Sequence, residues 1–398
     1  MALSPIQRPN DVAVPLTATL PFDPWLFVAA IGLLICSLVT LHGAAGSSFT
    51  DRQAIYSGIG LILMVAVSRF DYSRLREYRI GFYVILILSN LAVYAFPAVN
   101  NARRWIPLPG FDFQSSEFGK LLLILTLAAM MVDVGRHVSQ RRITTQILLL
   151  GLIPAMIVIK EPDLGTGLVY VTIAVATLFF GGVSWRYLVG LFTLFAVAVA
   201  LVLAVAPAVG IRVLPGYETS RLTTFIDGVS HCPAAGKTLA SKDAEQACYQ
   251  EQQALIGIGA GQKTGQKGGA TQTKFNFIPE AQDDFIFAVI AETYGFVGAA
   301  LVLSLFALLI WRALRIVTMS KNLFGTLIAG GVLSMLMFQV FLNVGMAIGI
   351  MPVTGVPLPL ISYGGSSVIV TLLAIGLLQS IHVQARTSTA AKARSILS

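Results

Sequence analysis

Two adjacent carboxylates, Asp283 and Asp284, are the side chains of this sequence best suited to acid–base chemistry. They follow Glu280 in the run Phe277–Phe287, immediately before a long apolar stretch. Carboxylates at or within a bilayer usually face a protein interior or a wet cavity, and they indicate a functional site. Such a group could take a proton from an attacking hydroxyl. The simpler alternative is that both acids cap the following helix, where negative charge meets the positive end of the helix dipole.

Further charged residues are predicted to lie on the same side of the membrane as this acidic pair. They form four groups: Arg103-Arg104, Glu117 with Lys120, Lys160-Glu161-Pro162-Asp163, and Arg221. Each group has a simple explanation, since Glu117 and Lys120 could form an exposed ion pair and the arginines could reach lipid headgroups. Together, the cations and acids predict a pocket for a lipid that carries a pyrophosphate, because cations can hold phosphates while an acid accepts a proton.

An uncharged stretch near the C-terminus is dense in proline, glycine and hydroxyl residues. The residues Asn343-Val344-Gly345-Met346 lead into it, and it ends at Gly364-Gly365-Ser366-Ser367. A re-entrant segment buried among helices needs such residues, because its backbone must find partners inside the protein. Ser362 and Ser366 could contact a substrate, or they could do no more than satisfy that backbone.

The elements that must position these groups are membrane helices. The chain of 398 residues is 56% hydrophobic and 12% charged, with a mean hydropathy of +0.79, which excludes an ordinary soluble globule. Its apolar runs have the length of bilayer-spanning helices, whose backbone groups are satisfied internally. We therefore predict an all-α bundle of ten spans. These cover approximately residues 23–42, 53–69, 80–97, 117–135, 144–160, 164–182, 187–207, 284–310, 323–350 and 366–385.

Lysines and arginines in the short loops predict the orientation of the bundle. They are concentrated on the side of the two termini, so we expect both termini in the cytoplasm. This places the large loop 208–283 outside, within a single polytopic domain covering residues 1–398. The first 22 residues lack the pattern of a cleaved signal peptide, and we expect the first helix to act as an uncleaved anchor. No clustered basic and aromatic residues indicate nucleic-acid binding.

The large loop contains a glycine-dense part at 257–269, which could approach a ligand closely or serve as a surface linker. Cys232 and Cys248 lie in the same loop, where an oxidising compartment permits a disulfide between them. A metal site that includes the adjacent His231 is the weaker alternative, because no further ligand spacing is evident. Cys36 lies in the first apolar run, and we expect it to be a small buried hydrophobe.

Several of these segments resemble the SEDS family of bacterial cell-wall polymerases, the RodA and FtsW group. The most specific is Pro-Val-Thr-Gly-Val-Pro-Leu-Pro-Leu-Ile-Ser-Tyr-Gly-Gly-Ser-Ser at 352–367, whose beginning is closer to RodA. The other matching segments are 103–105, 114–120, 162–166, 249–269, 277–287 and 343–351. Together they span nearly the whole membrane portion. Two departures stand out: Asp283 replaces a Thr or other polar residue, and Ser115-Ser116 replace the family's usual Pro-Ser/Ala.

The resemblance implies ten helices, a large outer loop between the seventh and eighth, and a peptidoglycan glycosyltransferase that uses lipid II in cell elongation. It implies that Asp284 is the essential acid. By the same match, Arg104, Glu117, Lys120 and Glu280 fall on functionally important positions. We expect Arg221, Ser362 and Ser366 to join them around the substrate, with Asp283 as a secondary acid. The implied partners are a class B penicillin-binding protein, which is a transpeptidase, and other membrane proteins of the elongation complex.

The expected reaction is polymerisation of lipid II at the outer face of the bacterial cytoplasmic membrane, with undecaprenyl pyrophosphate as the leaving group. Asp284 would be the general base, and Arg104, Lys120 and Arg221 would stabilise the departing diphosphate. A divalent cation such as Mg²⁺ or Mn²⁺, held by the acids, could share that role. The leading alternative is a lipid II flippase or another transporter that uses the same charged cavity. A scaffold for the elongation or division complex is compatible with the enzyme.

Overall fold

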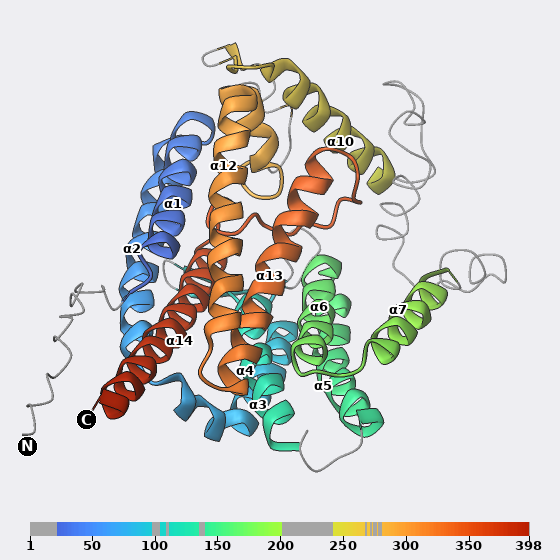
Figure 1. The fold of residues 1–398 in the computed structure, drawn as a ribbon. Coiled ribbons are helices and arrows are strands. Elements are labelled where there is room, and N and C mark those ends of the chain that lie inside the picture. Colours follow the sequence, from blue (N-terminus) through green and yellow to red (C-terminus); the bar gives the residue numbers. More distant parts are fainter. Residues whose placement is uncertain are drawn as a thin grey trace, which may run out of the picture.

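The structure is a computed structural model that describes residues 22–97, 104–108, 111–134, 140–200, 242–266, 269–270, 273, 277 and 281–397. Long helices run alongside one another as a bundle, while α10 lies across one end of it and α7 projects from its side (Figure 1). The helices are α1 (Pro24–Ala44), α2 (Ser47–Arg69), α3 (Arg79–Ala92), α4 (Ser115–Val134), α5 (Gln140–Lys160), α6 (Leu164–Phe180), α7 (Trp185–Ala200), α10 (Lys242–Gly261), α12 (Ile286–Met319), α13 (Leu323–Ala347) and α14 (Gly365–Leu397). Two short 3-10 helices, η1 (Tyr72–Tyr78) and η2 (Val93–Ala95), flank α3.

Helix starts coincide with capping residues in the sequence. Asp23 accepts hydrogen bonds from the amides of Trp25 and Leu26 at the start of α1. Asp163 accepts one from the amide of Thr166 at the start of α6. These side chains satisfy amides that have no partner within the first turn of a helix. The same acids therefore fix where two helices begin.

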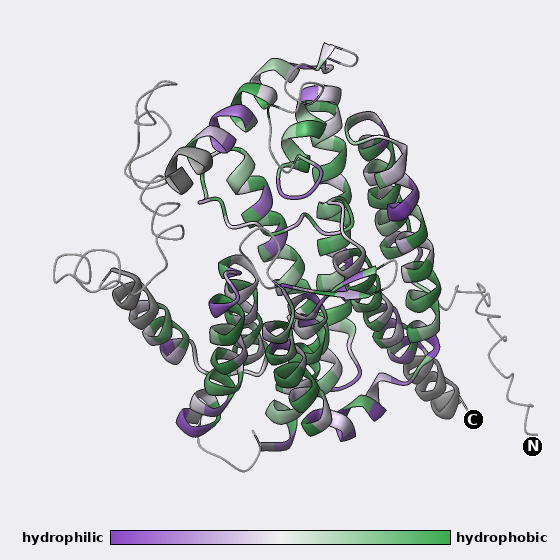
Figure 2. Cartoon of the chain, turned by 180° about the vertical axis from the view of Figure 1, so that it is seen from behind, coloured by the Kyte–Doolittle hydropathy of each residue, from purple (hydrophilic) through white to green (hydrophobic). Residues whose placement is uncertain are grey.

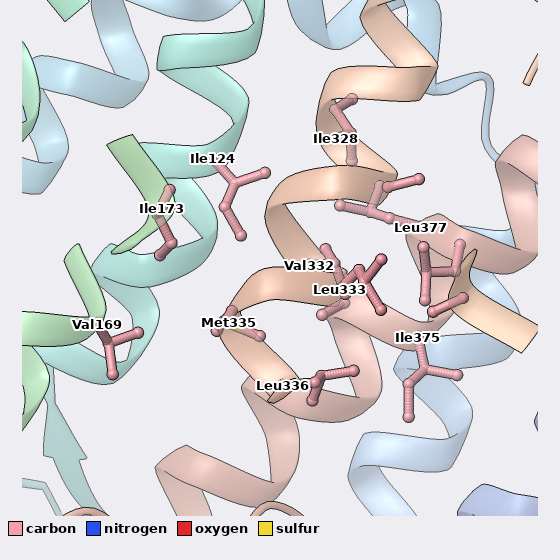
Figure 3. Close-up of a cluster of buried hydrophobic side chains, with 14 of the residues drawn as sticks. Ile124, Val169, Ile173, Ile328, Val332, Leu333, Met335, Leu336, Ile375 and Leu377 are labelled. Carbon is pink, nitrogen blue, oxygen red and sulfur yellow. The ribbon is translucent and has the colours of Figure 1, made fainter. Parts of the chain in front are cut away.

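Four helices meet around the centre of the bundle. Figure 3 shows Ile124 of α4, Ile173 of α6, Val332 of α13 and Ile375 of α14 among the apolar side chains packed there. All four are buried. This contact between α4, α6, α13 and α14 brings together segments far apart in the sequence, and polar residues at their ends are placed in one region.

The outer surface of the bundle is apolar, as expected for contact with lipid. Ile62, Phe192 and Phe296 are each more than 70% exposed, and much of the helical ribbon in Figure 2 carries the colour of hydrophobic residues. Among the described residues, seven helical segments are long and apolar enough to cross a membrane, and α6 is a shorter apolar helix. A described helix lies over each of the ten predicted spans. The helical membrane fold is therefore confirmed, whereas the count of ten spans and their orientation stay predictions.

The all-α prediction was wrong in one detail. Strands β1 (Trp105–Leu108) and β2 (Phe111–Gln114) form an antiparallel hairpin in which Trp105 pairs with Gln114 and Leu108 with Phe111. Each strand has only four residues. Such short strands lack the alternation that identifies a longer strand from sequence. The hairpin runs directly into α4 at Ser115.

Helix α12 is broken at Gly295, where φ is +67°. The amides of Phe296 and Val297 restart the helix by donating to the carbonyls of Gln262 and Lys263, at 2.8 and 3.2 Å. A Cβ on Gly295 would lie 2.7 Å from the carbonyl oxygen of Lys263, so only glycine fits there. The turn that follows α10 is therefore fitted into the break, and the predicted span 284–310 is interrupted.

The segment between α13 and α14, residues 348–364, contains no regular helix or strand. We call it the α13–α14 connection. Most of it from Val353 to Ser362 is buried, which agrees with the expected re-entrant character. Its backbone finds partners inside the protein, for example where Ser37 of α1 donates to the carbonyl of Ile361 at 2.7 Å.

Candidate functional site

Asp284 lies in the turn 281–285 that precedes α12. The helix begins one residue after Phe285, which is the N-cap and makes no side-chain capping hydrogen bond. Neither Asp283 nor Asp284 therefore occupies the capping position that the simpler interpretation required. The amide nitrogen of the Asn343 side chain donates to the carbonyls of both Asp284 and Val356, each at 2.8 Å. This bridge ties the acidic turn to the α13–α14 connection.

The carboxylate of Asp284 faces that connection at Gly355. Gly355 has a φ of +69°, and a Cβ placed on it would lie 3.3 Å from Oδ2 of Asp284. Glycine therefore fits here for two reasons: it adopts the left-handed backbone conformation without strain, and its lack of a side chain lets the Asp284 carboxylate approach closely. Asp284 is partly buried, so its carboxylate lies at a protein surface lined by the α13–α14 connection.

Ser362 holds the neighbouring acid through its backbone. Its hydroxyl donates to the carbonyl of Asp283 at 2.5 Å and accepts from the amide of Leu358 at 2.8 Å. The amide of Tyr363 donates to the carbonyl of Gln282 at 2.9 Å. Ser362 is 1% exposed. Its contacts are thus those of a residue that fixes the acidic turn, and its expected contact with substrate stays a prediction.

The α13–α14 connection also contacts the start of α6. A Cβ on Gly165 would lie 2.3 Å from the Val356 side chain and 2.7 Å from the carbonyl oxygen of Thr354. The two backbones can approach this closely only because residue 165 is glycine. The start of α6 and Asp284 therefore both contact the same short stretch, residues 354–356.

Arg104 reaches the start of α6 from the β-hairpin. Its guanidinium donates a hydrogen bond to the carbonyl of Pro162. Next to that carbonyl, Asp163 caps α6 and lies 3.4 Å from the hydroxyl of Ser116 and 3.5 Å from the side-chain amide of Gln114. Arg104 is thus bound at the start of α6, which contacts the α13–α14 connection; that it faces Asp284 stays a prediction.

Glu117 and Lys120 form a buried ion pair in the first turns of α4. The Lys120 ammonium lies 2.6 Å from Oε1 of Glu117, and each residue is 1% exposed. The exposed surface pair considered from the sequence is therefore wrong. The hydroxyl of Tyr170 on α6 donates to the carbonyl of Ser116 at 3.0 Å, which fixes this turn against α6. Moving two charges out of water costs free energy even when they form a pair. The buried pair therefore either lowers the stability of the fold or serves a function.

Glu161 belongs to this region, although the predicted substrate site did not include it. It is 0% exposed, and neither of its carboxylate oxygens has a hydrogen-bond partner among the described residues. The pKa of the Glu161 carboxyl is raised to about 8, chiefly by burial and then by the charge of Asp163, with the charge of Arg104 acting in the opposite direction. The available sequence signal was an acid beside the Pro-Asp that begins α6.

Ser366 connects the hairpin to α14. Its hydroxyl accepts from the amide of Gln114 and donates to the carbonyl of Asp112, both at 3.0 Å. Both bonds are made to the backbone of β2. Its expected role in substrate binding stays a prediction.

Three predicted residues, Arg221, Glu280 and Cys232, lie outside the described residues. Cys248 is disulfide-bonded, and Cys36 is a free cysteine; the pairing of Cys248 with Cys232 stays a prediction. Within the described ranges, no group of three or more His, Cys, Asp and Glu side chains is placed to hold a metal ion. The expected divalent cation therefore stays a prediction without assigned ligands.

Comparison with known proteins decides the family. The model of the FtsW/RodA/SpoVE cell cycle proteins matches residues 18–387. The chain belongs to this family. It is 35% identical to the peptidoglycan glycosyltransferase MrdB of Escherichia coli over 367 residues, which covers 90% of this chain and 93% of MrdB. The resemblance to the RodA and FtsW group is thus confirmed.

Solved structures of the FtsW/RodA/SpoVE family share the fold. The crystal structure of the rod shape determining protein RodA of Thermus thermophilus is 28% identical, with a TM-score of 0.66 over 92% of this chain and 98% of that one. A chain from a study of structural coordination of polymerization and crosslinking by a peptidoglycan synthase complex is 30% identical. It has a TM-score of 0.75 and covers 92% and 98% of the two chains.

Proposed function

We propose that this FtsW/RodA/SpoVE family member is a peptidoglycan glycosyltransferase that polymerises lipid II into glycan strands for cell elongation. It is a multi-pass protein of the bacterial inner membrane. Relatives named for this activity support the reaction, among them MrdB and the RodA of Treponema pallidum. The observation that supports the proposal is that residues 354–356 contact both Asp284, at Gly355, and the start of α6, at Gly165, where Arg104 donates to Pro162.

Asp284 acts as the general base. It accepts the proton of the C4 hydroxyl on the N-acetylglucosamine of the acceptor, and the resulting oxygen nucleophile attacks the anomeric carbon of the donor's N-acetylmuramic acid. The bond between that carbon and the diphosphate oxygen breaks, and the electron pair leaves on undecaprenyl diphosphate. The backbone bonds from Asn343 and Ser362 hold the acidic turn in place before substrate arrives.

The leaving diphosphate needs positive charge to stabilise it. Arg104 is anchored to a neutral acceptor, the carbonyl of Pro162, so its charge is not neutralised by that bond. We propose Arg104 as the group that receives the diphosphate, with Lys120 and Arg221 as further cations. Lys120 is paired with Glu117, and its contribution depends on how that pair rearranges when substrate binds.

Purified protein given lipid II in detergent, with and without a class B penicillin-binding protein, tests the proposal. We expect glycan polymer from the parent and none from Asp284→Asn, which keeps the size of the side chain and removes its basicity. Asp283→Asn is the matched control, because the substitution leaves in place the backbone carbonyl of Asp283 to which Ser362 donates. We expect that control to retain polymerisation.

Full activity of Asp284→Asn in a well-folded protein would contradict the role of Asp284 as base. Transport of lipid II across a liposome membrane without any polymer would favour the flippase instead. The related peptidoglycan synthase complex coordinates polymerization and crosslinking. This supports a penicillin-binding transpeptidase as the partner of our chain, and co-purification of the two proteins would test it.

A further inference from the structure

Glu161 presents an unusual combination of burial and missing partners. It is 0% exposed at the junction of α5 and α6, and neither carboxylate oxygen has a hydrogen-bond donor in the described part of the chain. An ionised carboxylate in such a place loses its hydration without compensation, which disfavours the charged form. The geometry thus favours the neutral carboxylic acid.

The hydroxyl groups of Tyr170 and Tyr94, on which the charge of Glu161 acts, donate their hydrogen bonds to other atoms. The Tyr170 hydroxyl of α6 donates to the carbonyl of Ser116, and the Tyr94 hydroxyl of η2 donates to the carbonyl of Ile157. Asp163, two residues along the chain, caps α6 and is a like charge. Among the described residues, Arg104 is the cation whose charge lowers the pKa of Glu161.

Arg104 is held by neither of the two adjacent acids. Its guanidinium donates to the carbonyl of Pro162, the residue that lies between Glu161 and Asp163. Its Nε atom is buried and has no partner within the described residues. A guanidinium next to a carboxylate normally forms a short, charge-assisted pair. The absence of such a pair here, within the described ranges, is explained if Glu161 carries a proton.

We propose that the charge of Glu161 determines which acceptor binds the Arg104 guanidinium. As a neutral acid, it leaves the guanidinium on the Pro162 carbonyl with its charge available to an anionic diphosphate. As a carboxylate, it draws the guanidinium to itself and competes with that ligand. This inference rests on the proposed function, because the diphosphate is that of the lipid-linked donor.

The protonation of Glu161 makes this role measurable. Its carboxyl has a pKa of about 8, raised first by burial and then by Asp163, and lowered by Arg104. The parent should therefore work below pH 8 and lose affinity for the donor above it. One deprotonation reduces the active fraction about tenfold per pH unit beyond the pKa. We expect the apparent KM for lipid II at pH 9 to rise about tenfold, with a smaller change in kcat.

The test compares pH profiles of polymerisation for the parent, Glu161→Gln and Glu161→Met. Both variants are uncharged at every pH. We expect each to polymerise lipid II at pH 7 with a KM close to that of the parent, and to show no rise in KM between pH 8 and 9. Glu251→Gln is the matched control, since Glu251 on α10 is also a buried carboxyl with a raised pKa, caused by desolvation. We expect it to keep the parent's alkaline rise.

Two results would overturn the inference. One is a parent profile without a rise in KM above pH 8, which is measured on the unmodified protein. The other is a rise that persists in whichever of Glu161→Gln or Glu161→Met is folded. A parent that makes no polymer at any pH would instead contradict the proposed function itself. The two failures are therefore distinguishable.

Discussion

At the scale of single residues, the candidate site consists of charged side chains that are either buried, such as Lys120 and Glu161, or adjacent to another acid, such as Asp284. Asp284, Arg104 and Lys120 could be selected from the sequence, because charge is rare in a chain that is 56% hydrophobic. Glu161 was named only as a member of the charged group 160–163, because its lack of hydrogen-bond partners among the described residues depends on packing. The hydroxyls of Ser362 and Ser366 were expected near substrate, yet both bond to backbone atoms.

Replacing Lys120 with alanine should destabilise the protein strongly. It leaves the Glu117 carboxylate buried without its cation, and breaking a buried pair costs about 3–5 kcal/mol. The double variant Glu117→Gln with Lys120→Met removes both charges and should recover most of that stability without recovering polymerisation. Thermal unfolding in detergent and polymer yield measure the two effects. If the double variant also polymerises lipid II, Lys120 serves only to balance Glu117.

At the scale of elements, the membrane-length helices could be predicted because they coincide with long apolar runs, whereas α10, which is polar over its first half, was not predicted. The break in α12 could not be predicted, since Gly295 is one of two glycines in the predicted span 284–310. The break accommodates the turn after α10, whose carbonyls accept hydrogen bonds from the amides of Phe296 and Val297 at the start of the second part of the helix. The hairpin β1–β2 was missed for a similar reason, because four-residue strands are set by tertiary contacts such as that of Ser366.

The α13–α14 connection should be sensitive to any side chain at Gly355. Gly355→Ala meets both the cost of a positive φ, about 1–2 kcal/mol, and a contact with the Asp284 carboxylate. Because a small displacement of a reacting group costs much rate, we expect kcat to fall roughly tenfold. Gly46→Ala is the control: φ there is +89° and nothing lies within 4 Å of the added Cβ. Equal kcat losses in the two variants would show that backbone strain from the positive φ, and not the contact with Asp284, causes the effect.

At the scale of the whole molecule, stability should depend on pH through Glu161. Its pKa is about 8 in the folded chain and 4.5 as a free side chain. The folded state therefore keeps a proton that the unfolded chain releases, and the contribution to stability is full below pH 4.5 and is lost as pH rises to 8. Relative to Glu161→Gln, the unfolding midpoint of the parent should fall across that window. A constant difference between the two midpoints would contradict the raised pKa.

The broken helix and the turn that fills it have a consequence for how the molecule is divided. Asp284, α10 and the two parts of α12 belong to the C-terminal half of the chain, whereas Arg104, Lys120 and Glu161 come from the N-terminal half. In the proposed mechanism, one half supplies the proton acceptor and the other supplies the cations that bind the diphosphate. A gene fragment that encodes one half would also separate α4 and α6 from α13 and α14, which pack together at the centre of the bundle.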